Sequence, residues 1–193
     1  VNKAGAGGTM GATEVANAAK DGHTMGMLPV GPMTTQPNLR TLPYGPDSFD
    51  YVCLVYSNPQ LLLVRADAPY KTYGELVAHA KANPGKLSFA SSGNGSSDHL
   101  TAELFWLQTG TSGVHVPYKG GGPAISDLLG SQVDASFQNV SSVMQHINAG
   151  KLRALAVTHV TSHFLVLERL ARILALTGGT MRAVRHGKTV RRA

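Results

Sequence analysis

Short apolar runs alternate with longer amphipathic stretches through the middle of the chain. The apolar runs favour β-strands, and they lie at residues 87–90, 113–117, 133–137 and 152–157. The amphipathic stretches favour helices, and they lie at residues 72–82, 97–109, 121–129 and 140–148. Strands that alternate with helices predict a parallel, doubly wound sheet with helices on both faces. We therefore expect residues 66–158 to form a complete α/β domain, the second of two lobes.

The first part of the chain follows the same alternation less regularly. Residues 9–20 favour a helix, because a glycine-rich start and a closing Asp-Gly pair frame them. Strands are expected at residues 23–28, 51–56 and 61–65. No strand precedes the first helix, so residues 1–65 are expected to form a partial first lobe. Cys53, the one cysteine of the sequence, falls in an apolar run and is interpreted as a buried, inert thiol.

The segment after Thr158 differs from the rest in its charge. Residues 159–193 hold seven of the 17 lysines and arginines but one of the 11 acidic residues, so the net charge of +6 arises there. Because the segment has no nucleic-acid motif and no aromatic residues interleaved with its arginines, we expect no nucleic acid as a partner. Residues 160–176 are compatible with a helix, and beyond them no periodicity predicts a fold. The segment is therefore treated as a divergent basic tail.

A loop of serine, glycine and asparagine follows the first strand of the α/β domain. We name it the serine loop, and its members are Ser91, Ser92, Gly93, Asn94, Gly95, Ser96 and Ser97. Ligands of doubly wound sheets bind beyond the carboxyl ends of the strands, where this loop is expected. Its backbone N–H groups and hydroxyls, with the N-terminus of the following helix, predict a carboxylate site. A simple N-cap role for Ser96 or Ser97 explains the same pattern.

Polar residues also follow the next two strands of this domain. Tyr118 and Lys119 come after the second strand, and Asn139 comes after the third. Since these strand ends are expected at one edge of the sheet, their loops should line one binding cleft. His99, just beyond the serine loop, is a further candidate for lining it. The alternative for Lys119 is a solvated side chain in a glycine-rich turn.

The sequence lacks the patterns that common catalytic sites need. It holds no Gly-x-Ser-x-Gly nucleophile elbow and no phosphate-binding Gly-x-x-x-x-Gly-Lys-Ser/Thr loop. Before the basic tail, no His-x-x-x-His pair with a carboxylate partner is present, and one cysteine cannot form a cysteine-based metal site. We therefore expect a binding protein with no catalytic residues, no cofactor and no metal.

Short motifs follow one another along the first 158 residues. They include Ala-Gly-Ala-Gly-Gly-Thr-Met-Gly at 4–11, Asp-Gly-His-Thr at 21–24, Lys-Thr-Tyr-Gly-Glu-Leu at 71–76, Asn-Pro-Gly-Lys-Leu at 83–87, the serine loop with Asp-His-Leu at 98–100, His-Val-Pro-Tyr-Lys-Gly at 115–120 and Ala-Gly-Lys-Leu-Arg-Ala-Leu-Ala-Val-Thr at 149–158. Together they resemble the Bug family, the extracytoplasmic receptors of tripartite tricarboxylate transporters.

The resemblance implies a two-lobed, type II periplasmic-binding-protein-like fold whose lobes close on a small carboxylic acid. It implies membrane transporter subunits as partners and a periplasmic location. It also implies that the serine loop holds a carboxylate, and that Val30 and Gly31 line the first-lobe side of the cleft.

The sequence departs from the family pattern at both ends. The family's opening strand and first ligand loop are missing before Val1, and the motifs stop at Thr158, so we expect an incomplete first lobe and weak or no ligand affinity. A transport receptor is the first expectation for the function. A sensor of the same fold that signals to a membrane partner is the alternative, ahead of an enzyme that uses the inter-lobe cleft. Which carboxylic acid binds stays open.

Overall fold

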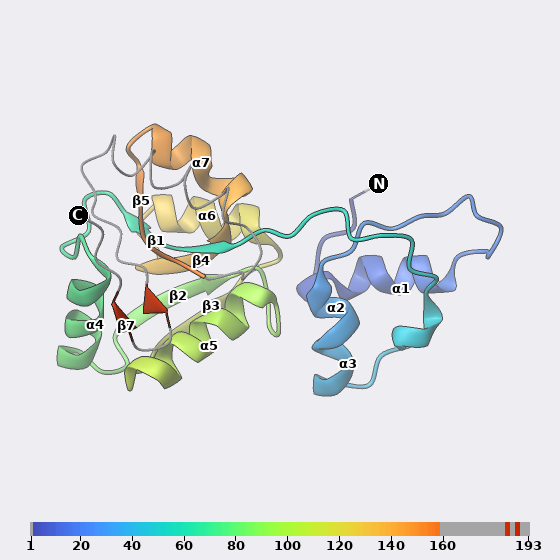
Figure 1. Cartoon of the computed structure of the whole chain (residues 1–193), viewed down its shortest axis with the longest axis horizontal. Coiled ribbons are helices and arrows are strands. Elements are labelled where there is room, and N and C mark those ends of the chain that lie inside the picture. The colour runs from blue at the N-terminus through green and yellow to red at the C-terminus, as the bar shows by residue number, and fades with distance from the viewer. Residues whose placement is uncertain (1, 159–183, 186–187, 190–193) are drawn as a thin grey trace. The chain divides into compact units, whose positions relative to one another are not determined.

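The computed structural model of the chain describes residues 2–158, 184–185 and 188–189, which belong to two compact units, Val1–Val157 and Thr158–Ala193. In the second unit, strands β6 (Val184–Arg185) and β7 (Lys188–Thr189) pair antiparallel. The helix expected at residues 160–176 lies outside the described residues. The first unit holds strands β1–β5 and helices α1–α7 (Figure 1).

A five-stranded mixed sheet is the centre of the first unit. Its strands are β1 (Gln60–Arg65), β2 (Leu87–Ser91), β3 (Gly113–Pro117), β4 (Ala135–Asn139) and β5 (Leu152–Val157), in the order β3-β2-β4-β1-β5. Strand β2 pairs parallel with β3 and β4, whereas β1 pairs antiparallel with β4 and β5. The prediction of a parallel sheet for residues 66–158 is confirmed, because β2, β3, β4 and β5 all run in one direction. Strand β1, which was assigned to the first lobe, is the antiparallel strand. A strand buried on both faces is a continuous apolar run whichever way it points, so the pattern carries no information on direction.

Helices cover both faces of the sheet, which confirms the doubly wound architecture (Figure 1). In chain order they are α4 (Tyr73–Ala82), α5 (Ser97–Thr109), α6 (Gly121–Leu129) and α7 (Val140–Asn148). Strand β1 contributes to both layers. Leu62 and Val64 belong to the cluster with α4 and α5, and Leu61 and Leu63 belong to the cluster with α6 and α7.

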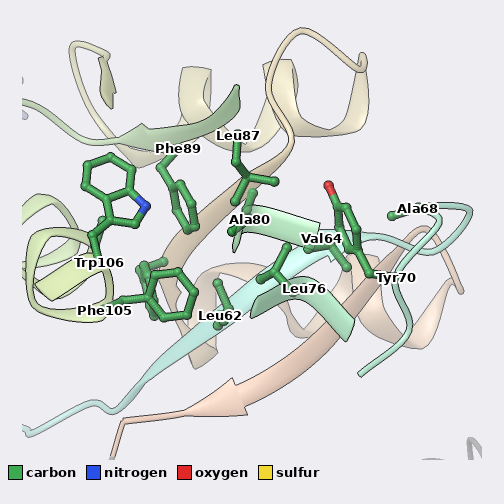
Figure 2. Close-up of a cluster of buried hydrophobic side chains, with 13 residues drawn as sticks. Leu62, Val64, Ala68, Tyr70, Leu76, Ala80, Leu87, Phe89, Phe105 and Trp106 are labelled. Atoms are coloured by element: carbon green, nitrogen blue, oxygen red, sulfur yellow. The ribbon is translucent and has the colours of Figure 1, made fainter. Parts of the chain in front are cut away.

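Aromatic rings fill much of the layer between the sheet and helices α4 and α5 (Figure 2). Phe89 of β2 lies 5.6 Å from Phe105, 5.2 Å from Trp106 and 5.9 Å from Phe137, measured between ring centroids. The indole of Trp106, the one tryptophan of the sequence, meets the Phe89 ring edge to face. Such aromatic pairs add to the burial of apolar area, and they fix α5 against β2.

The segment before β1 contains short helices. They are the 3-10 helix η1 (Ala6–Gly8), α1 (Thr9–Asn17), α2 (Val30–Thr34), α3 (Gln36–Leu39) and the 3-10 helix η2 (Pro46–Ser48). Ala12, Gln36 and Tyr44 are buried among them, and the Tyr44 hydroxyl donates a hydrogen bond to the Pro32 carbonyl at 3.0 Å. The helix expected at residues 9–20 is confirmed as α1, which ends earlier, at Asn17.

Two expected strands of this segment do not form. Residues 23–28 and 51–56 are irregular, and their apolar side chains are exposed, to 82% for Met25 and 85% for Val52. An apolar strand needs a partner to be stable, and among the described strands none pairs with either stretch. The interpretation of Cys53 as buried is wrong for the same reason, since its thiol is exposed.

The third expected strand of the first part forms as β1 but pairs within the sheet of the second lobe. The sequence boundary at residue 65 assigned this strand to the partial first lobe, whereas hydrogen bonds place it between β4 and β5. Its fully apolar centre needs cover on both faces, and the helix-covered sheet supplies it. Strand β4 also runs two residues later than expected, so Asn139 is its last residue.

Two leucines in contrasting environments should respond differently to truncation. Leu62 of β1 is 1% exposed and Leu54 is 77% exposed. We expect Leu62→Ala to lower the free energy of unfolding by about 2–5 kcal/mol, because it leaves a cavity in the core. Leu54→Ala, the matched control, should change it by less than about 0.5 kcal/mol. Equilibrium urea unfolding measures both, and equal losses would contradict the burial of β1.

The exposed thiol of Cys53 should react in the folded protein. We expect Ellman's reagent to modify the native chain rapidly and to a single equivalent without denaturant, because an accessible thiol can ionise and attack. Absorbance at the released thionitrobenzoate band measures the reaction, and Cys53→Ser should abolish it. A requirement for denaturant would show that the thiol is covered.

Candidate functional site

Several loops meet at one edge of the sheet because of its strand directions. The parallel strands β2, β3 and β4 end there, at Ser91, Pro117 and Asn139. Strand β1 runs the other way and begins there, with Gln60 opposite Asn139. The chain leaves β2 towards α5 on one face, but it leaves β3 and β4 towards α6 and α7 on the other face. Neighbouring strands whose connections depart to opposite faces leave a crevice between their loops, where ligands of such folds bind.

A cleft of about 1020 Å³ lies at this edge. Its volume is at the upper end of the range for small-molecule sites. Polar groups at the strand ends line it, with glycines and apolar residues from the segment before β1 on the other side. Residues of the lining that bear on its chemistry are Gly7, Gly8, Gly31, Gln60, Ser92, Ser96, Ser97, Asp98, Lys119, Gly121, Gln138, Asn139, Ser142 and His146.

The serine loop is held from within by Asp98. The carboxylate of Asp98 accepts hydrogen bonds from the backbone N–H of Ser92 at 2.6 Å and from its hydroxyl at 2.9 Å. The Asp98 side chain is buried, so these bonds replace water around its charge. Both carboxylate oxygens of Asp98 are therefore engaged by the loop.

The last two serines of the loop have different partners. Ser96 is the N-cap of α5 and accepts the His99 backbone N–H at 3.3 Å, as the N-cap alternative predicted. The Ser97 hydroxyl accepts the Gln60 amide N–H at 3.1 Å, and Thr101 donates to the Gln60 amide oxygen at 2.7 Å. Gln60 therefore ties the start of β1 to the first turn of α5.

The glycines of the loop allow a close approach to the segment before β1. Gly95 has φ +69°, and a Cβ there would overlap the side-chain amide of Gln36. Gly93 has φ +137°, and a Cβ there would lie 3.1 Å from the Gly7 nitrogen. Gln36 also donates its side-chain N–H to the Asn94 carbonyl at 2.6 Å. Only glycine suits both the backbone conformation and the contact.

Tyr118 and Lys119 differ in what they offer to the cleft. The Tyr118 hydroxyl donates to Asp127 of α6 at 2.7 Å, and burial together with this bond raises the pKa of Tyr118 to about 12. Lys119 lines the cleft, and among the described residues no carboxylate lies within ion-pair distance of its ammonium. Lys119 can therefore supply a cation to a bound anion.

His99 lies behind the serine loop. Its Nδ1 accepts the Gly95 backbone N–H at 3.0 Å, and its Nε2 lies 3.3 Å from the Glu103 carboxylate. Its ring stacks on His115 of β3 with centroids 3.8 Å apart, and His115 Nε2 is hydrogen-bonded to the Ser91 hydroxyl. Burial, together with charge repulsion from His99, lowers the pKa of His115.

The structure brings together some of the expected site residues. Gly31, Ser96, Ser97, Lys119 and Asn139 line the large cleft. Gly93, Asn94 and Tyr118 line a smaller hollow of about 210 Å³ that also includes Lys119. The expected residues that line neither hollow are Val30, Ser91, Gly95 and His99. Ligand contact by any of these residues stays a prediction.

Sequence reasoning missed Gln60 and His146 as members of the lining. Gln60 is a polar residue at the start of an otherwise apolar run, which is a usable signal for a strand end at a site. Gln138, which directly precedes Asn139, also lines the cleft. His146 is two turns into α7, and nothing in the local pattern indicated that it faces the cleft.

The described residues limit the chemistry of the site. They hold no cluster of three or more histidine, cysteine or acidic side chains that could bind a metal ion. In the same part of the chain, no helix is long and apolar enough to cross a membrane.

Comparisons with known proteins agree on one family. The model of the tripartite tricarboxylate transporter family receptor matches residues 1–173, so the match extends beyond Thr158. Protein BugT of Bordetella pertussis is 36% identical over 178 residues, which are 89% of this chain and 54% of that protein. The chain spans about half the length of the relatives it matches.

Solved structures are similar over most of the chain. R. palustris Rpa4515 with adipate shares 33% identity at a TM-score of 0.74, covering 82% of this chain and 54% of that one. MatC (Rpa3494) from Rhodopseudomonas palustris with bound malate shares 30% identity at a TM-score of 0.73, covering 92% and 61%.

Substitution of Gly95 should test the close approach of the serine loop. Gly95 and Gly85 have φ values of +69° and +72°, but only at Gly95 would a Cβ meet other atoms, those of Gln36 and Leu39. Gly85→Ala should lower the free energy of unfolding by about 1–2 kcal/mol from the backbone conformation alone. We expect Gly95→Ala to lower the free energy of unfolding by more than Gly85→Ala does. Adding Gln36→Ala to Gly95→Ala should recover part of this extra loss, because it removes the side-chain amide that the new Cβ would meet. Equal losses in urea unfolding at the two glycines would contradict the contact.

Proposed function

Because the chain belongs to the tripartite tricarboxylate transporter receptor family, we propose that it captures a small carboxylic acid in the cleft at the strand ends. The matched family is one of solute-binding receptors, which are not enzymes, and we infer that this protein is not an enzyme either. We further infer a periplasmic location and transfer of the ligand to membrane transporter subunits.

The observation that carries this proposal is the convergence of three helix N-termini on the cleft. Ser97 of α5, Gly121 of α6 and Asn139, the N-cap of α7, all line it. Each helix N-terminus carries roughly half a positive charge and unpaired N–H groups, which favour an anion. Lys119 adds a full positive charge at the same place.

Both acidic side chains of the lining already have partners. Asp98 is engaged by Ser92 through both carboxylate oxygens. Glu14 forms an ion pair with Lys3 at 3.2 Å. The cleft therefore offers hydrogen-bond donors and the Lys119 ammonium, and its two carboxylates already have partners, which supports a carboxylate ligand.

The bound adipate and malate of two similar structures support this ligand class. Both are small carboxylic acids, and a cleft of about 1020 Å³ has room for either. Among the described residues, nothing favours a sensor or an enzyme over a transport receptor.

Removal of the Lys119 charge should weaken carboxylate binding. We expect titration calorimetry to detect binding of at least one acid from a panel that includes malate and adipate, and none of the matching amides. Lys119→Gln should weaken that binding by about 10- to 100-fold, the range that loss of a charge-assisted hydrogen bond gives.

Lys86→Gln is the matched control, because Lys86 is exposed and precedes β2 at the other edge of the sheet. It should leave the affinity unchanged. Failure of every acid to bind the folded chain would overturn the proposed function. Equal affinity of the Lys119→Gln variant and the parent chain would remove Lys119 from the site.

A further inference from the structure

Two stacked imidazoles hold the back of the serine loop. His99 binds the loop at Gly95, and His115 binds it at Ser91, with the two rings 3.8 Å apart and inclined by 12°. Neither histidine is part of the cleft lining, so neither is placed to contact a ligand there. Their hydrogen bonds instead fix the backbone whose other side faces the cleft, where Ser92, Ser96 and Ser97 line it.

The bond from Gly95 depends on the charge of His99. A backbone N–H can only donate, so Nδ1 of His99 must accept and must carry no proton. The remaining proton of the neutral ring then lies on Nε2, which faces the Glu103 carboxylate at 3.3 Å. Protonation of the ring would place an N–H at Nδ1 against the Gly95 N–H. The hydrogen bond cannot exist in that state.

The two rings of the pair have different surroundings. Among the described residues, the titratable groups that face the pair are Glu103 and Asp98 of α5. Glu103 contacts His99 directly, and Asp98 is occupied by Ser92. Positive charge on both rings, whose centroids lie 3.8 Å apart, would be strongly disfavoured.

We propose that His99 is a positioning residue that keeps the serine loop ready for a carboxylate only while its imidazole is neutral, so that mild acid weakens ligand capture. The proposal rests on the proposed function for its ligand, but its structural part concerns the loop alone. Histidine changes charge between about pH 5 and 8, so the response falls in a physiological range.

The cleft itself contains a group with the opposite tendency. His146 lines it, and a positive charge on its imidazole would favour an anion. A net loss of affinity in acid therefore points to the loop and not to the charge of the lining.

The first arm of the test needs no ligand. Amide hydrogen exchange of Gly95, expressed as a protection factor so that the intrinsic pH dependence cancels, is measured at about pH 7.5 and 5.5. We expect protection to fall at least about tenfold in acid in the parent chain, because the acceptor is lost. Unchanged protection in the folded chain would overturn the proposal.

Substitutions at position 99 separate the proton from the side chain. In His99→Asn, the amide oxygen is bonded to Cγ as Nδ1 is, and it accepts at every pH, so protection should persist in acid. His99→Ala should show low protection at both pH values. His79→Asn is the matched control, since His79 is an exposed residue of α4 whose ring lies 5.2 Å from that of Tyr70 between centroids, and it should keep the parent profile. If His99→Ala does not fold, the comparison of His99→Asn with the parent chain still tests whether the loss of Gly95 protection depends on the imidazole proton.

The second arm measures the dissociation constant of adipate and of malate at the same two pH values. The parent chain should lose at least about tenfold more affinity in acid than His99→Asn does, and ligand ionisation cancels because both proteins meet the same ligand. If Gly95 protection falls in acid but the parent chain and His99→Asn lose the same affinity, the link between the loop and ligand capture would be overturned. Loop opening without binding of either acid at either pH would instead overturn the proposed function and leave the histidine-controlled loop in place.

Discussion

The burial of β1 in the middle of the sheet is the constraint on which the rest of the structure depends. Four successive apolar side chains of this strand are covered, alternately, by helices on the two faces. The strand enters the sheet from the edge where β2, β3 and β4 end, so it carries Gln60 to that edge. It also connects the first 59 residues of the chain directly to the cleft. One buried strand therefore joins the hydrophobic core to the candidate site.

Much of the second lobe was predictable from its pattern, and the reasons are physical. Helices α5, α6 and α7 and strands β3 and β5 have the expected bounds, because local periodicity and their flanking turns specify them. The direction of β1 was not predictable, since burial on both faces gives the same run in either direction. The expected strands at residues 23–28 and 51–56 failed because a strand needs a partner that local sequence does not contain.

The candidate site shows a similar division. Lys119, Asn139 and the end of the serine loop were found because they follow strands whose ends share an edge. Gln60 and His146 come from elements whose orientation is set by tertiary packing, so the local pattern did not indicate them. The same holds for His99, which was expected to line the cleft and instead supports the loop through Gly95. Sequence proximity to a site does not distinguish a lining residue from a supporting one.

The position of Trp106 makes the protein its own spectroscopic reporter. The indole is packed against Phe89 in the layer between the sheet and α5, and the sequence holds no other tryptophan. Its fluorescence emission therefore tracks the integrity of that layer, and it carries no direct signal from the helices before β1. A transition in the far-ultraviolet circular dichroism that precedes the emission shift would thus be assigned to parts of the chain outside that layer, and coincident transitions would mean that the chain melts as one cooperative unit.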